Sequence, residues 1–419
     1  MRKRDIFKTA PARTVHRVLI LADESATWRI AGLRQLDRLV LTLNEFAKAQ
    51  GKRDVVRVCV LWKPDLDVGQ TWMPNQAGLT GLGLADQIEG SNEFDLVLNT
   101  HVFLYRESVA QLLEHLAPRT CRGSAGTELW QNMSRDVRDT IQATLNAASA
   151  STPWVYVSTR SEIARCEKRF LKFNGKSQDG LASRHLNRPF SRSLSRWLLK
   201  LPITPSAWSL LIFALPICAA FAFLQGTYLG FVAGAAIFQL YSIVDGCDGE
   251  IARAKFLQTE FGRRLDSLCD LIGNLLLALS LGLGLALQAE RAGSLGWIYI
   301  AEGIAATLLI VLSEGIVFAR RSRSEAISGS FTKWNGALYQ RHQEFFERSG
   351  ILFLGERFAW WLVQLTKRDM AMIAFLFLAL VGLPAWSLHL LLAVSAISSA
   401  LAGNAFLRQP APALPQEAS

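Results

Sequence analysis

The sequence predicts a protein in two parts: an α/β soluble N-terminal domain with a mainly parallel sheet, and an all-α membrane domain of six transmembrane helices. Two observations indicate this division. Residues 1 to about 200 alternate charged and apolar segments, whereas long apolar runs dominate from Ala207 onwards. Strand-like and helix-like segments also alternate in the first part, which is typical of an α/β layered fold. A chain of 419 residues is long enough for two or three such domains.

The predicted strands of the first part are short apolar runs, and the predicted helices carry apolar residues at helical spacing. Strands are expected at residues 16–23 (HRVLILAD), 55–62 (VVRVCVLW), 94–105 (FDLVLNTHVFLY) and 154–159 (WVYVST). Helices are expected at residues 32–50, at 107–116 and after the last strand.

Six apolar segments of the second part approach the roughly 20 residues that a transmembrane helix needs. They are residues 206–224, 229–244, 265–287, 296–318, 370–385 and 388–407, of which the second and fifth are short.

Basic residues are distributed unevenly between the connections of these six segments. They gather before the first span, in the 246–264 loop and in the 319–368 loop, which holds nine Lys or Arg, whereas Arg291 is the only one in the other loops. Because positive loops stay in the cytoplasm, we expect a multi-pass protein of the cell (inner) membrane with both termini cytoplasmic.

The net charge of +10 indicates contact with anionic lipid and not with nucleic acid, because the sequence contains no recognised nucleic-acid motif. The six cysteines show no paired spacing, which fits a reducing compartment.

A basic residue recurs every fourth position before the first span, at Arg184, Arg188, Arg192, Arg196 and Lys200. Pro189 marks the expected start of a helix, so that Arg184 and Arg188 can precede it. The other three residues form one basic stripe, which predicts an amphipathic helix on the membrane surface; an ordinary solvated helix is the alternative. The proline-rich end QPAPALPQEAS is expected to be disordered. The predicted domains are therefore a cytoplasmic domain at 1–175, an interfacial linker helix at 176–205, a membrane domain at 206–408 and a tail at 409–419.

Four aspartates lie at the cytoplasmic boundary of the second and third spans. Asp245 and Asp248 are three residues apart, and Asp266 and Asp270 are four apart, so each pair shares one helix face. On antiparallel neighbouring helices the four carboxylates converge, and their repulsion calls for a positive partner. Hard divalent cations that prefer oxygen ligands, Mg²⁺ or Mn²⁺, are the natural partner. A pair of such ions suits phosphoryl chemistry.

Small residues accompany the aspartates. Gly249, Ala252 and Gly262 leave room for a ligand's phosphates near the backbone. Arg253 can form a bidentate contact with a phosphate, or it can pair with one of the aspartates.

The complete pattern, Asp245-x2-Asp248-Gly249-x2-Ala252-Arg253-x8-Gly262-x3-Asp266-x3-Asp270, resembles the signature of the CDP-alcohol phosphotransferase family. The resemblance implies transfer of a phosphoalcohol group from a CDP-alcohol to an acceptor hydroxyl, with release of CMP, by a homodimer. It implies metal ligation by Asp245, Asp248, Asp266 and Asp270, and nucleotide binding by Asp245, Gly249, Ala252, Arg253 and Gly262. Asp270 would also take the proton of the attacking hydroxyl. A carboxylate beside a cation is a weak base, so orienting that hydroxyl is the alternative role.

Two further segments, 177–209 and TKRDMAM at 366–372, resemble the subgroup that fuses a cytidylyltransferase to this membrane enzyme. The order of elements in the first part is similar to a sugar-nucleotide-type nucleotidyltransferase. The catalytic parts of that family do not match, because the first loop, DESATWR, has no glycine, and Thr100 and His101 stand where an acidic metal ligand is expected. We therefore expect a degenerate, non-catalytic domain, although Asp23, Arg29 and His101 could form a different site.

The substrates are less defined than the reaction class. The subgroup favours a polar acceptor such as an inositol phosphate, and a lipid head group is the alternative. Arg368 and Arg408 could bind an acceptor's phosphate or could serve topology alone. The rival functions are a cytidylyltransferase acting through the soluble domain and a transporter that uses the same acidic cluster.

Overall fold

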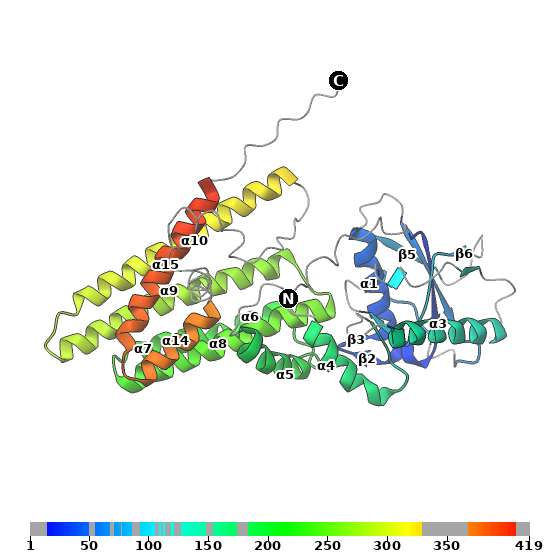
Figure 1. Cartoon of the computed structure of the whole chain (residues 1–419), viewed down its shortest axis with the longest axis horizontal. Coiled ribbons are helices and arrows are strands. Elements are labelled where there is room, and N and C mark those ends of the chain that lie inside the picture. Colours follow the sequence, from blue (N-terminus) through cyan, green and yellow to red (C-terminus); the bar gives the residue numbers. More distant parts are fainter. Residues whose placement is uncertain are drawn as a thin grey trace, which may run out of the picture. The chain divides into compact units, whose positions relative to one another are not determined.

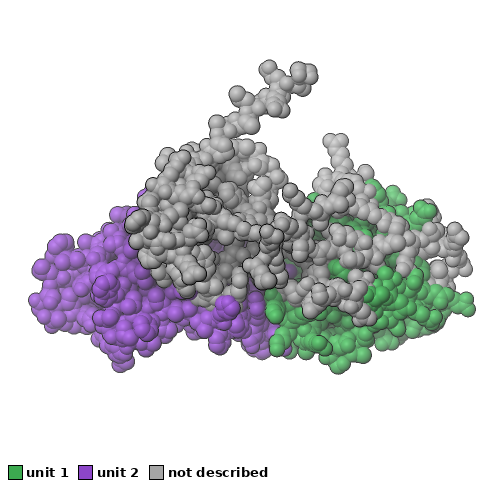
Figure 2. Space-filling model, in the orientation of Figure 1, with its two compact units in different colours: residues 1–174, 199–201, 254–256 green, residues 175–198, 202–253, 257–419 purple. Residues whose placement is uncertain are grey.

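The computed structural model describes residues 15–49, 55–67, 71–76, 78–85, 93–104, 109, 112–113, 119–120, 127–147, 154–173, 183–328 and 368–407. The chain divides into two compact units, coloured separately in Figure 2. Unit 1 comprises residues 1–174 with 199–201 and 254–256, and unit 2 comprises residues 175–198, 202–253 and 257–419. The predicted boundaries at 175, 205 and 408 stay predictions.

A four-stranded parallel sheet lies at the centre of unit 1 (Figure 1), in the order β5-β4-β1-β7. Its strands are β1 (Arg17–Ala22), β4 (Val56–Trp62), β5 (Leu82–Ala85) and β7 (Leu96–Asn99). β1 pairs with both β4 and β7, and its residues 18–22 are fully buried. Apolar residues of α1 (Gln35–Ala49) and α3 (Thr127–Ala147) complete the same core. The predicted parallel sheet is confirmed, whereas α3 was not expected.

The predicted strand at 94–105 is wrong as a single element. The chain forms β6 (Glu93–Phe94), β7 and β8 (Val102–Leu104), with a turn at Thr100 and His101. The backbone N–H of Thr100 donates to Leu21 on β1, whereas the carbonyl of His101 accepts from Val157. The chain therefore leaves the parallel sheet at this turn, and β8 pairs antiparallel with β10 (Trp154–Tyr156).

Short elements account for the remaining differences in unit 1. A hairpin of β2 (Arg29–Ile30) and β3 (Leu33–Arg34) precedes α1, so the helix begins three residues later than expected. The hairpin turn places Gly32 at φ +84°, a left-handed conformation that glycine adopts freely. β9 (Arg119–Thr120) pairs with β6, and α4 (Ile163–Phe173) follows β10. The helix expected at 107–116 lies largely outside the described residues.

Unit 2 is helical throughout its described part (Figure 1). A π-helical segment, η4 (Ser183–Asn187), leads into α5 (Arg188–Leu198). The helices that follow are α6 (Pro205–Ile212), α7 (Ala214–Phe223), α8 (Tyr228–Lys255), α9 (Glu260–Arg291), α10 (Trp297–Ser328), α14 (Arg368–Leu380) and α15 (Pro384–Leu407). Thr204 caps α6 with Pro205 in the first turn, and Thr259 caps α9, which explains why these helices begin where they do.

Four helical stretches among the described residues are long and apolar enough to cross a membrane. They are Pro205–Phe223, Tyr228–Lys255, Glu260–Arg291 and Trp297–Val317, and they match the first four predicted spans. α14 has 13 residues, and the apolar stretch of α15 at Pro384–Ala400 is also shorter. Unit 2 is thus a helical domain with four candidate membrane spans in its described part, and the expected six transmembrane helices are not confirmed.

Close helix packing in unit 2 depends on small residues. A Cβ atom on Gly282 of α9 would lie 2.7 Å from the carbonyl oxygen of Tyr299 on α10, and Gly303 is the facing residue. On the neighbouring pair α10 and α15, His389 forms an ion pair with Glu302 at 2.9 Å.

α5 begins at Arg188, one residue before the start expected at Pro189, and its exposed and buried sides differ in character. Phe190 and Trp197 are exposed, whereas Arg188, Ser191 and Ser195 are buried. Arg188 therefore does not belong to an exposed basic stripe, because it is paired inside the unit with Glu250.

Candidate functional site

The four aspartates lie on regular helix, not in a long loop. α8 continues to Lys255 and α9 begins at Glu260, so that only residues 256–259 connect them. The predicted 246–264 loop is wrong because residues such as Cys247 and Ile251 are fully buried and extend the helix. Phe256 then adopts a left-handed φ of 56° and ends α8.

Three of the four carboxylates come together. Asp245 and Asp248 from α8 and Asp266 from α9 each offer an oxygen within 4.8 Å of the other two. Ser209 of α6 donates a hydrogen bond of 2.7 Å to Oδ2 of Asp248, and the backbone N–H of Gly249 donates to its Oδ1. A set of clustered carboxylate oxygens is the donor set that a hard divalent cation requires, so these residues fit such an ion.

Asp270 has different partners. Its Oδ1 accepts a hydrogen bond of 3.0 Å from the Tyr241 hydroxyl, and a second one from Nη1 of Arg368. Nη2 of Arg368 donates to Oδ2 of Asp245 at 2.7 Å. The guanidinium of α14 thus joins the two ends of the acidic cluster, and it also lies over the Tyr241 ring.

The glycines provide space for protein side chains. A Cβ atom on Gly249 would lie 3.0 Å from Nη1 of Arg253, one turn further along α8. A Cβ atom on Gly262 would lie 3.1 Å from Oγ1 of Thr259 and 3.2 Å from Oγ of Ser206. Ala252 is buried close to Arg253 on the same helix. These predicted nucleotide-binding residues therefore border the aspartates, and their binding role stays a prediction.

Sequence reasoning missed two site residues, Tyr241 and Ser209. Tyr241 precedes Asp245 by four residues on the same helix, so its position on the carboxylate face carried a usable signal. Ser209 lies 39 residues from its partner Asp248, and no local pattern indicates the contact. For Arg368 the sequence left two roles open, binding of an acceptor's phosphate or topology alone, and it did not indicate the contacts with Asp245 and Asp270. Arg408 lies outside the described residues.

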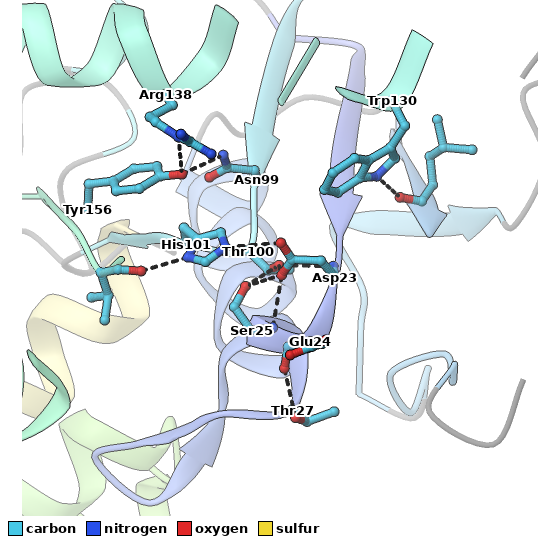
Figure 3. Close-up of polar contacts among 12 residues, drawn as sticks. Asp23, Glu24, Ser25, Thr27, Asn99, Thr100, His101, Trp130, Arg138 and Tyr156 are labelled. Carbon is cyan, nitrogen blue, oxygen red and sulfur yellow. Dashed lines mark hydrogen bonds and ion pairs between the residues drawn. The ribbon is translucent and has the colours of Figure 1, made fainter. Parts of the chain in front are cut away.

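A second polar cluster occupies the carboxyl ends of β1 and β7 in unit 1 (Figure 3). Asp23 accepts hydrogen bonds from the Ser25 hydroxyl (2.6 Å), the Thr100 hydroxyl (3.2 Å) and Nε2 of His101 (3.0 Å). Nδ1 of His101 faces the carbonyl of Val157 at 2.7 Å. Because both ring nitrogens face acceptors, the imidazole is held in its doubly protonated, charged form.

The pKa values of this pair follow from their mutual contact. Burial alone would raise the pKa of Asp23, but the hydrogen bond and charge of His101, together with Ser25, lower it to about 2. Burial would likewise lower the pKa of His101, and the contact with Asp23 outweighs it, so the His101 pKa is raised. Asp23 and His101 thus form a stable ion pair, while Arg29 is an exposed residue of β2.

The comparison with protein families bears on unit 2. Residues 203–340 match the model of the CDP-alcohol phosphatidyltransferase family. The match lies in the C-terminal part of the chain. All eight residues of the aspartate pattern lie within the matched range, whereas Arg368 lies beyond it.

Curated relatives share part of the chain. Proteins named "Bifunctional IPC transferase and DIPP synthase" are 35% identical to it over 143 residues in Rubrobacter xylanophilus, and 35% identical over 118 residues in both Thermococcus kodakarensis and Aquifex aeolicus. These matches cover 34%, 28% and 28% of this chain. They cover only 32%, 26% and 26% of the relatives, so the chain matches about a third of their length or less.

Proposed function

We propose that this protein is an integral membrane CDP-alcohol phosphotransferase. The acceptor's hydroxyl oxygen forms a bond to the phosphorus that carries the donor alcohol, the bond from that phosphorus to the CMP oxygen breaks, and CMP leaves. The observation that supports this most strongly is the convergence of the Asp245, Asp248 and Asp266 oxygens within 4.8 Å, inside a domain of this family.

Asp245, Asp248 and Asp266 would hold Mg²⁺ or Mn²⁺, and Asp270 is close enough to Asp245 to share Arg368 with it. We propose two ions. A bound divalent cation supplies charge neutralisation at the pyrophosphate and at the leaving phosphate.

Asp270 is the proposed acceptor of the proton from the attacking hydroxyl, or the residue that orients this hydroxyl. Tyr241 and Arg368 both bind its Oδ1, which fixes the direction of the carboxylate. Such fixation favours proton transfer, because a base must be held within hydrogen-bond reach of the proton it takes.

Arginines would bind the phosphates on either side of the reacting centre. Arg253, with Gly249, Ala252 and Gly262 beside it, is proposed to hold the nucleotide. Arg368 is proposed to bind a phosphate on the acceptor with N–H donors other than the two that bind Asp245 and Asp270, since a guanidinium has five. Arg408 is proposed for the same phosphate.

The relatives' printed name includes "DIPP synthase", and it favours a polar alcohol such as an inositol phosphate as acceptor here. A lipid head group is the alternative. We further propose a homodimer with six transmembrane helices and cytoplasmic termini in the cell membrane. Residues 1–175 form a non-catalytic nucleotidyltransferase-like domain, supported by the mutual engagement of Asp23 and His101 at its sheet edge.

The test is to incubate the purified protein with Mg²⁺, labelled CDP-inositol or CDP-diacylglycerol and a panel of acceptors, and to measure CMP. Asp266→Asn should lower CMP release at least about 100-fold, because it removes a metal ligand while keeping the side-chain shape. Glu290→Gln is the matched control, since it neutralises an exposed carboxylate at the other end of α9. Full activity of Asp266→Asn would remove this residue from the site, and absence of CMP release with every donor would reject the function.

A further inference from the structure

The back of α8 carries a buried ion pair that the aspartate pattern does not include. Nη1 of Arg188, the first residue of α5, donates to Oε1 of Glu250 at 2.8 Å. The Ser191 hydroxyl donates to the same oxygen at 3.1 Å. The side chains of Arg188 and Glu250 are 6% and 1% exposed, so the pair is secluded from solvent.

Further polar contacts continue this interface along α8. Sγ of Cys247 donates to the carbonyl of Ser191 at 3.4 Å, and Nε2 of Gln239 donates to Oδ1 of Asn187 at 3.1 Å. Gly246 leaves room for Arg188, because a Cβ atom there would lie 3.2 Å from its Nη1. The residues of α8 that take part are Gln239, Ser242, Gly246, Cys247 and Glu250.

This interface and the aspartates lie on opposite sides of one helix. Successive residues of an α-helix are about 100° apart, so Glu250 is rotated by roughly 200° from Asp248. Asp245 is separated by about 140° from Glu250 and by about 120° from Gln239. The η4–α5 segment thus holds α8 from behind, while the carboxylates point toward α9.

The position of the carboxylates is sensitive to the rotation of α8 about its axis. Side-chain ends lie about 5–6 Å from a helix axis, so a rotation of about 20° moves a carboxylate oxygen by about 2 Å. That displacement is as large as a whole metal–oxygen distance of about 2.0–2.6 Å. A small rotation is therefore enough to separate Asp245 and Asp248 from Asp266.

We propose that Arg188 and Glu250 are positioning residues that fix the rotation of α8, and through it the affinity of the aspartate cluster for a divalent cation. A charged pair suits this role because its hydrogen bonds are directional, whereas an apolar contact tolerates rotation. The inference rests on the cation site of the proposed function and concerns residues outside that site.

The experiment measures Mn²⁺ binding to the purified full-length protein by titration calorimetry. Arg188→Met/Glu250→Met removes both charges together, so no unpaired charge stays buried and the fold is expected to persist. The dissociation constant for Mn²⁺ should rise at least tenfold, while helical content and the thermal midpoint stay near wild type. The exchanged pair Arg188→Glu/Glu250→Arg should bring the constant back to within threefold of wild type.

Controls separate positioning from a purely structural role. Glu302→Met/His389→Met removes another ion pair of the same unit, between α10 and α15, and should leave Mn²⁺ affinity unchanged. If Arg188→Met/Glu250→Met folds and binds Mn²⁺ like wild type, the inference is refuted. If that double variant fails to fold, Ser191→Ala is the deciding test, because it removes one hydrogen bond to Glu250. Ser191→Ala should raise the dissociation constant for Mn²⁺ two- to fivefold. An unchanged dissociation constant in Ser191→Ala also refutes the inference.

Mn²⁺ binding also distinguishes this inference from the proposed function. Wild-type protein that binds Mn²⁺, loses it on Asp266→Asn and releases no CMP would reject the function and leave the positioning role standing. Wild-type protein that binds no Mn²⁺ would reject the positioning role itself.

Discussion

Replacing Arg368 by glutamine should destabilise the protein in EDTA and much less in the presence of Mn²⁺. Arg368 makes two charge-assisted hydrogen bonds, to Asp270 and to Asp245, and its side chain is 25% exposed. Removing one partner of a fully buried pair costs about 3–5 kcal/mol. Partial exposure of Arg368, Asp245 and Asp270 reduces this to about 2–3 kcal/mol.

A divalent cation should replace most of the lost stabilisation. Without the guanidinium, the carboxylates repel one another, and bound Mn²⁺ neutralises them in its place. The measurement is the thermal unfolding midpoint of wild type and Arg368→Gln in detergent, in EDTA and in saturating Mn²⁺. The gap between the two proteins should be largest in EDTA and should narrow with Mn²⁺.

The control is Arg264→Gln, which breaks an exposed i,i+4 pair with Glu260 on α9 and should change stability by less than about 0.5 kcal/mol. Equal midpoints for wild type and Arg368→Gln in EDTA would show that the guanidinium does not stabilise the cluster. If the difference in thermal midpoint is the same with and without Mn²⁺, the Arg368 guanidinium and Mn²⁺ do not neutralise the same carboxylates.

Two other predictions concern unit 1 and the helix packing of unit 2. The pair of Asp23 and His101 should stabilise unit 1 most between about pH 4 and 6.5. Because the pKa of His101 is raised in the folded protein, the stabilisation from His101 is lost as the pH rises through that folded pKa. Because the pKa of Asp23 is lowered to about 2, the stabilisation from Asp23 is lost as the pH falls from 3.8 towards 2. His101→Gln should therefore lower the unfolding free energy by about 2 kcal/mol at pH 6 and by much less at pH 9, as followed by chemical denaturation; an equal loss at both pH values would contradict the charged pair. Gly282→Ala should destabilise the contact of α9 with α10 by about 1–3 kcal/mol, because its Cβ would lie 2.7 Å from a backbone oxygen. Gly315→Ala on α10 meets nothing within 4 Å and should be neutral or slightly stabilising; comparable thermal midpoints for the two variants would disprove the packing argument.

Much of the fold could be predicted because it rests on local periodicity. The strands at 17–22 and 56–62 and the first four apolar spans are long, regular patterns. The break at Thr100 and His101 was hidden, because apolar residues on both sides gave the appearance of one strand. The actual turn depends on hydrogen bonds to Leu21 and Val157, which are distant in the sequence.

The site shows the same limit. Spacing along two helices was enough to indicate that Asp245, Asp248 and Asp266 converge, since helical geometry is local. The link between Asp270 and Asp245 could not be predicted, because it depends on Arg368, which is 98 residues away from Asp270. The pairing of Arg188 with Glu250 could not be predicted for a related reason: a repeat of basic residues shows their common face, but not which of them contacts a buried acid.

The two-sided use of α8 limits how this stretch of sequence can change. Between Gln239 and Arg253 one side of the helix carries Asp245 and Asp248, and the other side is in contact with η4 and α5. Nearly every turn is therefore constrained on both sides. A mutational library that seeks new substrates would lose most members if it were directed here. Diversity is better introduced on α6 and α14, whose hydrogen bonds to the aspartates come from one side chain each, Ser209 and Arg368.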